Sequence, residues 1–242
     1  MTRRRQRRNP FPDLAQVGRR LVGGSAAAPS STLGDGVVVP TAEEIQAALD
    51  AIPADLSWEW AAPRLIPVFE RGYVDGTPGD PLINTLAPIG VGIGFAIDMG
   101  PVLARVSRSL ALRWEASVEQ IERAAFAHLA EVARTITPRD VQPFVYRGHM
   151  VRGLGEPGGW SSSLVLDGAD TLSRIFGPQD QVFTVPSRNN LLAFDAATPS
   201  HAIVDVTLAF EGLDPNPLEL DPFTLVDGVL AWDGLSDPVP EP

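Results

Sequence analysis

Two carboxylates and two histidines are the side chains of this sequence that could do acid–base or metal chemistry. Glu70 and Asp98 each close an apolar, strand-like run, and His128 and His149 follow later in the chain. Residues at strand ends often gather in active sites, and two carboxylates with one histidine can transfer protons or hold a divalent metal ion. One hypothesis is therefore a hydrolase or metal-dependent enzyme in which Glu70, Asp98 and one of the two histidines converge on one pocket.

The same residues also have a simpler structural interpretation, which we favour. Glu70 is followed at once by Arg71, so that an ion pair with this or another arginine accounts for its charge. Asp98 can cap the turn that follows it. His128 borders the apolar stripe of a predicted helix, where a histidine is more often packed and hydrogen-bonded than catalytic. The catalytic residues therefore stay unassigned, with these positions as candidates.

Two further motifs resemble functional signatures but have the wrong spacing. Gly90, Gly92 and Gly94 alternate inside an apolar run, whereas a dinucleotide-binding loop places its glycines at a strand-to-helix turn with two residues between the last two. Alternating glycines in a strand instead leave one face bare for close packing. The run 159–163, Gly-Trp-Ser-Ser-Ser, lacks the closing glycine of a nucleophile elbow and is predicted to be a loop. We therefore predict no cofactor-binding residue and no metal site.

The residue types that are missing exclude several classes of reaction. The chain has no cysteine, and all 19 of its basic residues are arginine. Disulfides, thiolate nucleophiles, thiolate metal sites, Schiff-base lysines and the lysine of a phosphate-binding loop are therefore excluded. No apolar stretch approaches the length of about 20 residues that a membrane-spanning helix needs, so no transmembrane segment is expected.

Charge is divided unevenly along the chain, whose net charge is −11. Residues 1–20 hold seven arginines and one acid, a net charge of +6, so the other 222 residues carry −17. No lysine or arginine follows Arg188, whereas ten acids do. An acidic body repels a phosphate backbone, so we expect no nucleic-acid binding by the folded part. The basic arm could lie on the acidic body or contact RNA or an anionic membrane.

A predicted sheet and one long helix position the candidate residues. The runs 65–70 and 89–98 are rich in β-branched and aromatic residues and are bounded by Gly or Pro, which indicates buried strands. Residues 117–136 show apolar positions at helical spacing, and Ser117 with Gln120 forms a capping box at the start. The fold class predicted is α+β, with a mixed, mainly antiparallel sheet on which the long helix 117–136 and short helices pack.

The remaining segments are predicted in the same way. Short helices are expected over 41–52 and 170–176; strands over 144–154, 181–187, 189–196 and 201–212; and a closing hairpin over 223–232. Trp58 and Trp60 are expected to share one face of an extended segment, as core or edge packing or as a stacking platform. The segment 101–114 fits a strand and turn as well as a helix.

Three regions differ in composition and define the predicted domain organisation. Residues 1–36 are predicted to be a disordered basic arm and linker, and 233–242 an acidic, proline-rich tail that is also disordered. Residues 37–232 are predicted to form a single α+β domain. Two subdomains meeting near 137–150 are the alternative.

The order of these segments resembles the YtpQ-like family of uncharacterised bacterial proteins. The resemblance rests on FAIDMG, then Trp114 and SVEQIERAAFAHL, then TLSRIF and FTVPSRNNLLAFD, and it covers about residues 60–232. It implies an α+β fold and a cytoplasmic setting. It implies no reaction, because the family has none assigned.

The dispersed polar chemistry favours a protein that works through its surface. Long apolar strands that could leave a sheet edge open, and two charged ends, are typical of a non-catalytic protein-binding or regulatory module. The sequence predicts a protein partner, whose identity it does not give, and leaves the oligomeric state open.

Overall fold

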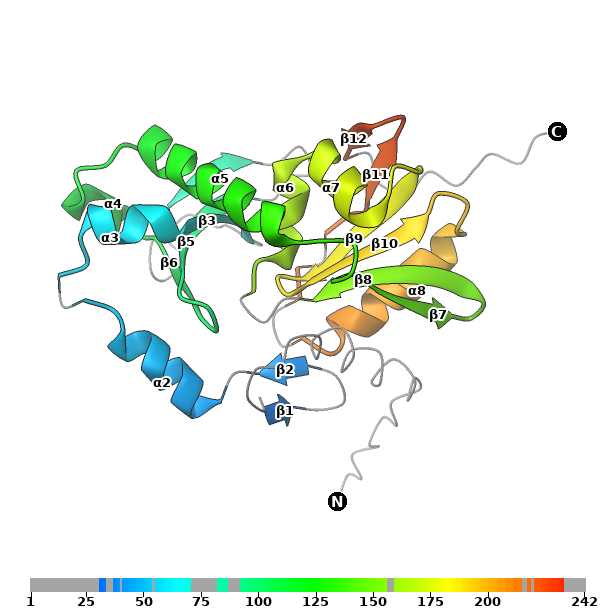
Figure 1. Cartoon of the computed structure of the whole chain (residues 1–242), viewed down its shortest axis with the longest axis horizontal. Coiled ribbons are helices and arrows are strands. Elements are labelled where there is room, and N and C mark those ends of the chain that lie inside the picture. Colours follow the sequence, from blue (N-terminus) through cyan, green and yellow to red (C-terminus); the bar gives the residue numbers. More distant parts are fainter. Residues whose placement is uncertain are drawn as a thin grey trace, which may run out of the picture.

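The computed structural model describes residues 31–33, 37–39, 41–53, 55–70, 82–86, 92–155, 159–214, 217–218 and 220–232. Most of the predicted disordered arm and linker, namely 1–30 and 34–36, and the acidic tail lie outside these residues, whereas 31–33 of that linker form the strand β1. The described part is α+β, as predicted, and its strands form a six-stranded sheet, a four-stranded sheet and a small hairpin (Figure 1). All described strand pairs are antiparallel.

The four-stranded sheet carries the two candidate carboxylates. Strand β5 (Gly92–Asp98) pairs with β3 (Leu65–Glu70), with β4 (Ile83–Leu86) and with β6 (Leu103–Arg105). The strands predicted to end at Glu70 and Asp98 are thereby confirmed. The ambiguous segment 101–114 contains both kinds of structure, because β6 is followed by the helix α4 (Arg108–Arg113).

The six-stranded sheet follows the order β12-β11-β9-β10-β8-β7. Its strands are β7 (Gln142–Tyr146), β8 (His149–Gly155), β9 (Gln181–Ser187), β10 (Asn190–Asp195), β11 (Phe223–Val226) and β12 (Val229–Ala231). Asp227 and Gly228 form the turn of the predicted closing hairpin, both with positive φ. Arg147 and Gly148 have the same geometry, so the single strand predicted over 144–154 is in fact the hairpin β7–β8.

The helices begin where the capping signals predict. The long helix α5 (Val118–Thr135) has Ser117 as N-cap and a capping box with Gln120. A second capping box, between Thr41 and Glu44, starts the helix α2 (Ala42–Asp50). Helix α5 packs along β3. The other described elements are β1 (Ser31–Leu33), β2 (Val37–Val39), α3 (Trp58–Ala61) and the 3₁₀ helices η1 (Ala62–Arg64) and η2 (Ser161–Ser163).

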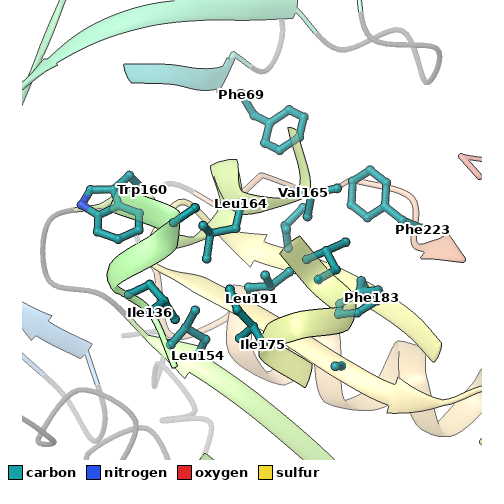
Figure 2. Packing of buried hydrophobic residues seen from close by; sticks show 14 of the residues in the cluster. Phe69, Ile136, Leu154, Trp160, Leu164, Val165, Ile175, Phe183, Leu191 and Phe223 are labelled. Atoms are coloured by element: carbon teal, nitrogen blue, oxygen red, sulfur yellow. The ribbon is translucent and has the colours of Figure 1, made fainter. Parts of the chain in front are cut away.

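Helices cover both faces of the six-stranded sheet. Helix α8 (Ser200–Glu211) lies on one face, and α6 (Leu164–Asp167) and α7 (Ala169–Phe176) lie on the other (Figure 1). The core on the α6 and α7 side also contains Phe69 of β3, so it joins the two sheets. Figure 2 shows Phe69 facing α6 and Phe223 of β11. Burying each such ring contributes about 2 kcal/mol, which fixes β3, and with it Glu70, against the larger sheet.

The strand predicted over 201–212 is wrong, because this segment is the helix α8. Seven of its twelve residues are apolar and they do not follow a single period, so both a period of two and a helical period fit the pattern. The buried residues Ala202, Ile203, Val206 and Phe210 follow the helical period and pack on the sheet. The β-branched residues that favoured a strand are tolerated in a helix when packing against the rest of the protein stabilises that helix.

Two smaller predictions also need correction. Trp58 and Trp60 lie in the short helix α3, which places them on different sides and not on one face of an extended segment. Trp58 contacts the ring of Trp114, and Trp60 lies under the guanidinium of Arg64, so both serve packing. The serines at 161–163, predicted as a loop, form the 3₁₀ helix η2.

Candidate functional site

Glu70 is a buried carboxylate that the geometry of β5 accommodates. Its exposed fraction is 5%, and it pairs across the sheet with Gly92. Its side chain lies over Gly94, where an added Cβ would come within 2.7 Å of the Cγ of Glu70. The packing interpretation of the alternating glycines is thereby confirmed at Gly94, whose missing side chain gives Glu70 its space.

Two arginines converge on this carboxylate. Arg105 Nη2 lies 3.0 Å and Arg188 Nη2 lies 3.3 Å from Glu70 Oε2, and Arg188 Nη2 also donates to the Phe69 carbonyl oxygen at 3.3 Å. Burial raises the pKa of Glu70, and the charges of Arg188 and Arg105 oppose this rise. Burial likewise lowers the pKa of Arg188, with Glu70 acting in the opposite direction. We call Glu70, Arg105 and Arg188 the Glu70 cluster.

The Glu70 cluster extends to the buried serines of η2. The backbone N–H of Ser162 and the hydroxyl of Ser161 both donate to the carbonyl oxygen of Arg188, at 3.1 and 3.4 Å. The hydroxyls of Ser162 and Ser163 are buried and have no hydrogen-bond partner among the described residues. These serines therefore link the two sheets, and enclosure keeps their hydroxyls from acting as nucleophiles on a substrate in solvent.

The strand register separates the two candidate carboxylates. Glu70 lies opposite Gly92, at the start of β5, whereas Asp98 is the last residue of that strand. Both side chains are on one face, because paired residues and every second residue share a face. Six residues of β5 at about 3.3 Å each put them about 20 Å apart. The expected convergence of Glu70 with Asp98 is therefore wrong.

Asp98 and His128 do come together. His128 Nε2 lies 3.9 Å from Asp98 Oδ2, and Asp98 Oδ1 accepts a hydrogen bond from the N–H of Gly100 at 2.8 Å. The turn-capping role expected of Asp98 is thus confirmed. The other imidazole nitrogen, Nδ1, is buried and has no partner among the described residues. A carboxylate can orient an imidazole for base catalysis, but here the free nitrogen faces protein and not solvent.

His149 belongs to the other sheet. It begins β8 and pairs with Tyr146 across the β7–β8 hairpin. Within the described part of the chain, no group of three or more histidine, aspartate or glutamate side chains is arranged to hold a metal ion. The four candidate residues therefore occupy three separate places.

A groove beside α8 is the feature that the sequence did not predict. Its volume is about 350 Å³, and its lining residues are Val204, Thr207, Leu208, Glu211, Leu220, Asp221 and Pro222. Val204 and Leu208 are 43% and 58% exposed, although they belong to a helix whose opposite side is packed on the sheet. We call this surface the α8 groove.

The described residues that line the groove include four apolar residues and two acidic ones, Glu211 and Asp221, which we call its rim. Glu211 ends α8, and Asp221 precedes the strand β11 on the other side of the groove. No lysine or arginine is among the described residues that line it. A groove of this kind suits an apolar side chain whose neighbours carry positive charge.

The sequence did not predict this groove because residues 201–212 were predicted to form a strand. Read as a strand, Val204 and Leu208 fall on the same face as the buried residues Val206 and Phe210. A signal was present, however: seven of the twelve residues are apolar, and Val204 and Leu208 lie outside the stripe that a helix packed on a single sheet face buries.

No helix among the described residues has the length and hydrophobicity needed to cross a membrane. Comparison with protein-family models, with characterised proteins and with solved structures found no match to this chain.

Proposed function

We propose that this protein is a non-catalytic binding module that docks a segment of a protein partner in the α8 groove. The observation that carries this proposal is that α8 is apolar on both sides. One side is used by the core, and the other leaves Val204 and Leu208 exposed beside a groove. An apolar surface of this kind is typical of an interaction site, since covering each of these side chains contributes on the order of 1 kcal/mol.

The rim defines the chemistry of the partner. Glu211 and Asp221 favour a segment in which an apolar side chain is flanked by arginine or lysine. A stable protein interface buries about 1,200 Å² or more, so the groove would be the anchor of a larger contact. The same negative rim disfavours a nucleic acid as the occupant. A cytoplasmic setting, which the YtpQ-like resemblance implies, is part of this proposal.

An enzyme is the weaker interpretation of the same structure. It would rest on Asp98 and His128 alone, because Glu70 is about 20 Å away by register and neutralised by two arginines. The enclosed Nδ1 of His128 gives this pair no position for a substrate. We therefore favour binding over catalysis.

The proposal is tested by cross-linking followed by measurement of affinity. A photo-reactive amino acid replaces Leu208 in the full chain in its own cells, and Leu112, an exposed leucine on α4, is replaced in the matched control. We expect one protein to be captured at 208 and not at 112. That protein, once purified, should bind the Leu208→Asp variant at least about tenfold more weakly than the wild type, and the Leu112→Asp variant with unchanged affinity.

Two results contradict the proposal. One is equal capture at both positions, or none at 208. The other is a captured protein that binds the Leu208→Asp variant as tightly as the wild type, because its contact is then elsewhere.

A further inference from the structure

We infer that residues 11–22 of this chain occupy the α8 groove when no partner does. This inference rests on the proposed function, because it takes the α8 groove to be a binding surface. It gives the basic arm, whose role the sequence left open, a defined place on the acidic body.

Charge complementarity is the first argument. The arm holds a net charge of +6 over residues 1–20, and Arg19 and Arg20 lie within the segment 11–22. The groove is rimmed by Glu211 and Asp221 and lies in the part of the chain after Arg188, which has ten acids and no lysine or arginine. Attraction between unlike patches selects and orients such a contact.

The apolar spacing of the segment is the second argument. Phe11, Leu14, Val17 and Leu21 follow one another at intervals of three, three and four residues. This is the pattern of anchors by which a peptide lays one apolar face into a hydrophobic groove. The exposed side chains of Val204 and Leu208, one turn apart on α8, offer the matching surface.

The length of the connection is the third argument. Eight residues, 23–30, separate Val22 from β1, the first described element, and at about 3.3 Å each they can span about 26 Å. A domain of about 200 residues has a radius of gyration of about 16 Å. The connection is longer than this radius, so residues 11–22 can lie on the surface of the domain within that distance of β1. Tethering also gives the arm an effective concentration of about 1 mM, which favours even a weak contact.

The test uses the purified full chain with the photo-reactive residue at 208, and at 112 as the matched control. We expect adducts between position 208 and residues 11–22, and none from position 112. The variant Leu14→Asp/Leu21→Asp keeps every arginine and should lose these adducts. A fluorescent peptide of residues 11–22 should bind this variant about tenfold more tightly than the wild type, because the competing arm has been released.

The inference is overturned if position 208 forms no adduct with the arm, or if positions 208 and 112 label it equally. Adducts that join isotopically light and heavy copies also overturn it, since the arm would then bind a second molecule. The inference is also overturned if the peptide binds the variant and the wild type with equal affinity. Partner capture in cells is a separate readout: it can succeed when the arm adducts fail, and it can fail when they succeed.

Discussion

Charged side chains are usually exposed and large apolar side chains are usually buried. The Glu70 cluster and the α8 groove depart from this pattern in opposite ways. The Glu70 cluster buries a carboxylate and part of two guanidinium groups, whereas the α8 groove exposes Val204 and Leu208. In the Glu70 cluster the departure is compensated, because every charge has a partner at hydrogen-bonding distance. In the groove the described residues leave the apolar surface uncovered.

This difference separates a structural role from the binding role that we propose. A compensated buried charge holds its neighbours in place, and Glu70 and Arg188 join β3 of the smaller sheet to the segment after β9 of the larger one. An uncompensated apolar surface contributes nothing to folding and becomes stable only when something covers it. Substitutions in the two regions should therefore have opposite effects on stability and on binding.

Arg188→Met is expected to give the largest loss of stability. Methionine fills similar space but leaves the buried Glu70 carboxylate with Arg105 alone and removes the bond to the Phe69 carbonyl. Removing one partner of a buried ion pair costs about 3 kcal/mol of the free energy of unfolding. Urea unfolding of the full-length variant measures this loss.

Two controls sharpen the comparison. Arg147→Met breaks the exposed pair with Asp205 and should cost less than about 1 kcal/mol. Leu208→Ser in the α8 groove should change stability by less than about 0.5 kcal/mol. If Arg188→Met were as mild as these two, the Glu70 cluster would not hold the sheets together and its charges would be available for a ligand.

Gly94→Ala is expected to have an intermediate effect. The new Cβ would lie 2.7 Å from the Cγ of Glu70, whose carboxylate is fixed by two arginines and cannot move away freely. Overpacking of this kind costs about 2 kcal/mol. In a Glu70→Ala background the obstructing Cγ is gone, so the double variant should be less destabilised than the sum of the single variants by at least about 1 kcal/mol. Additive effects in urea unfolding would show that Glu70 does not depend on the space at Gly94.

The sequence predicted those parts of the fold that local chemistry decides. The capping boxes at Thr41 and Ser117 bring a hydroxyl and a carboxylate or amide within reach over three residues, and both helices begin there. The Asp227–Gly228 turn follows from the positive φ that glycine permits. These signals need no knowledge of the rest of the chain.

Long-range packing decides the parts that the sequence could not predict. The pairing of Glu70 with Arg188 joins residues 118 positions apart, so no local pattern distinguishes it from the expected pair with Arg71. Only the antiparallel register of β3 and β5 shows that the carboxyl ends of the two strands lie at opposite ends of the pair. Helix α8 was missed because its second apolar side, with Val204 and Leu208, does not pack in the core, so that its apolar positions do not follow the helical period alone.

The smallest effect we predict is a pH dependence of unusual sign at Glu70. Burial raises the pKa of this carboxyl above its ordinary value of 4.5, more than Arg188 and Arg105 lower it. The folded protein therefore binds a proton at Glu70 more tightly than the unfolded chain does. By linkage, the contribution of Glu70 to the free energy of unfolding falls as the pH rises from about 4.5 through the folded-state pKa and is constant above it.

Glu70→Gln removes this titration and so isolates it. We expect the free energy of unfolding of the wild type minus that of Glu70→Gln to decline with rising pH in urea titrations from about pH 4 to about pH 8. The same difference taken against Leu208→Ser should stay flat, because that substitution changes no titrating group. A wild-type advantage that grows with pH would mean that the two arginines outweigh burial and that Glu70 is an ordinary salt-bridged carboxylate. The Glu70 cluster and the α8 groove would then differ only in how exposed their side chains are.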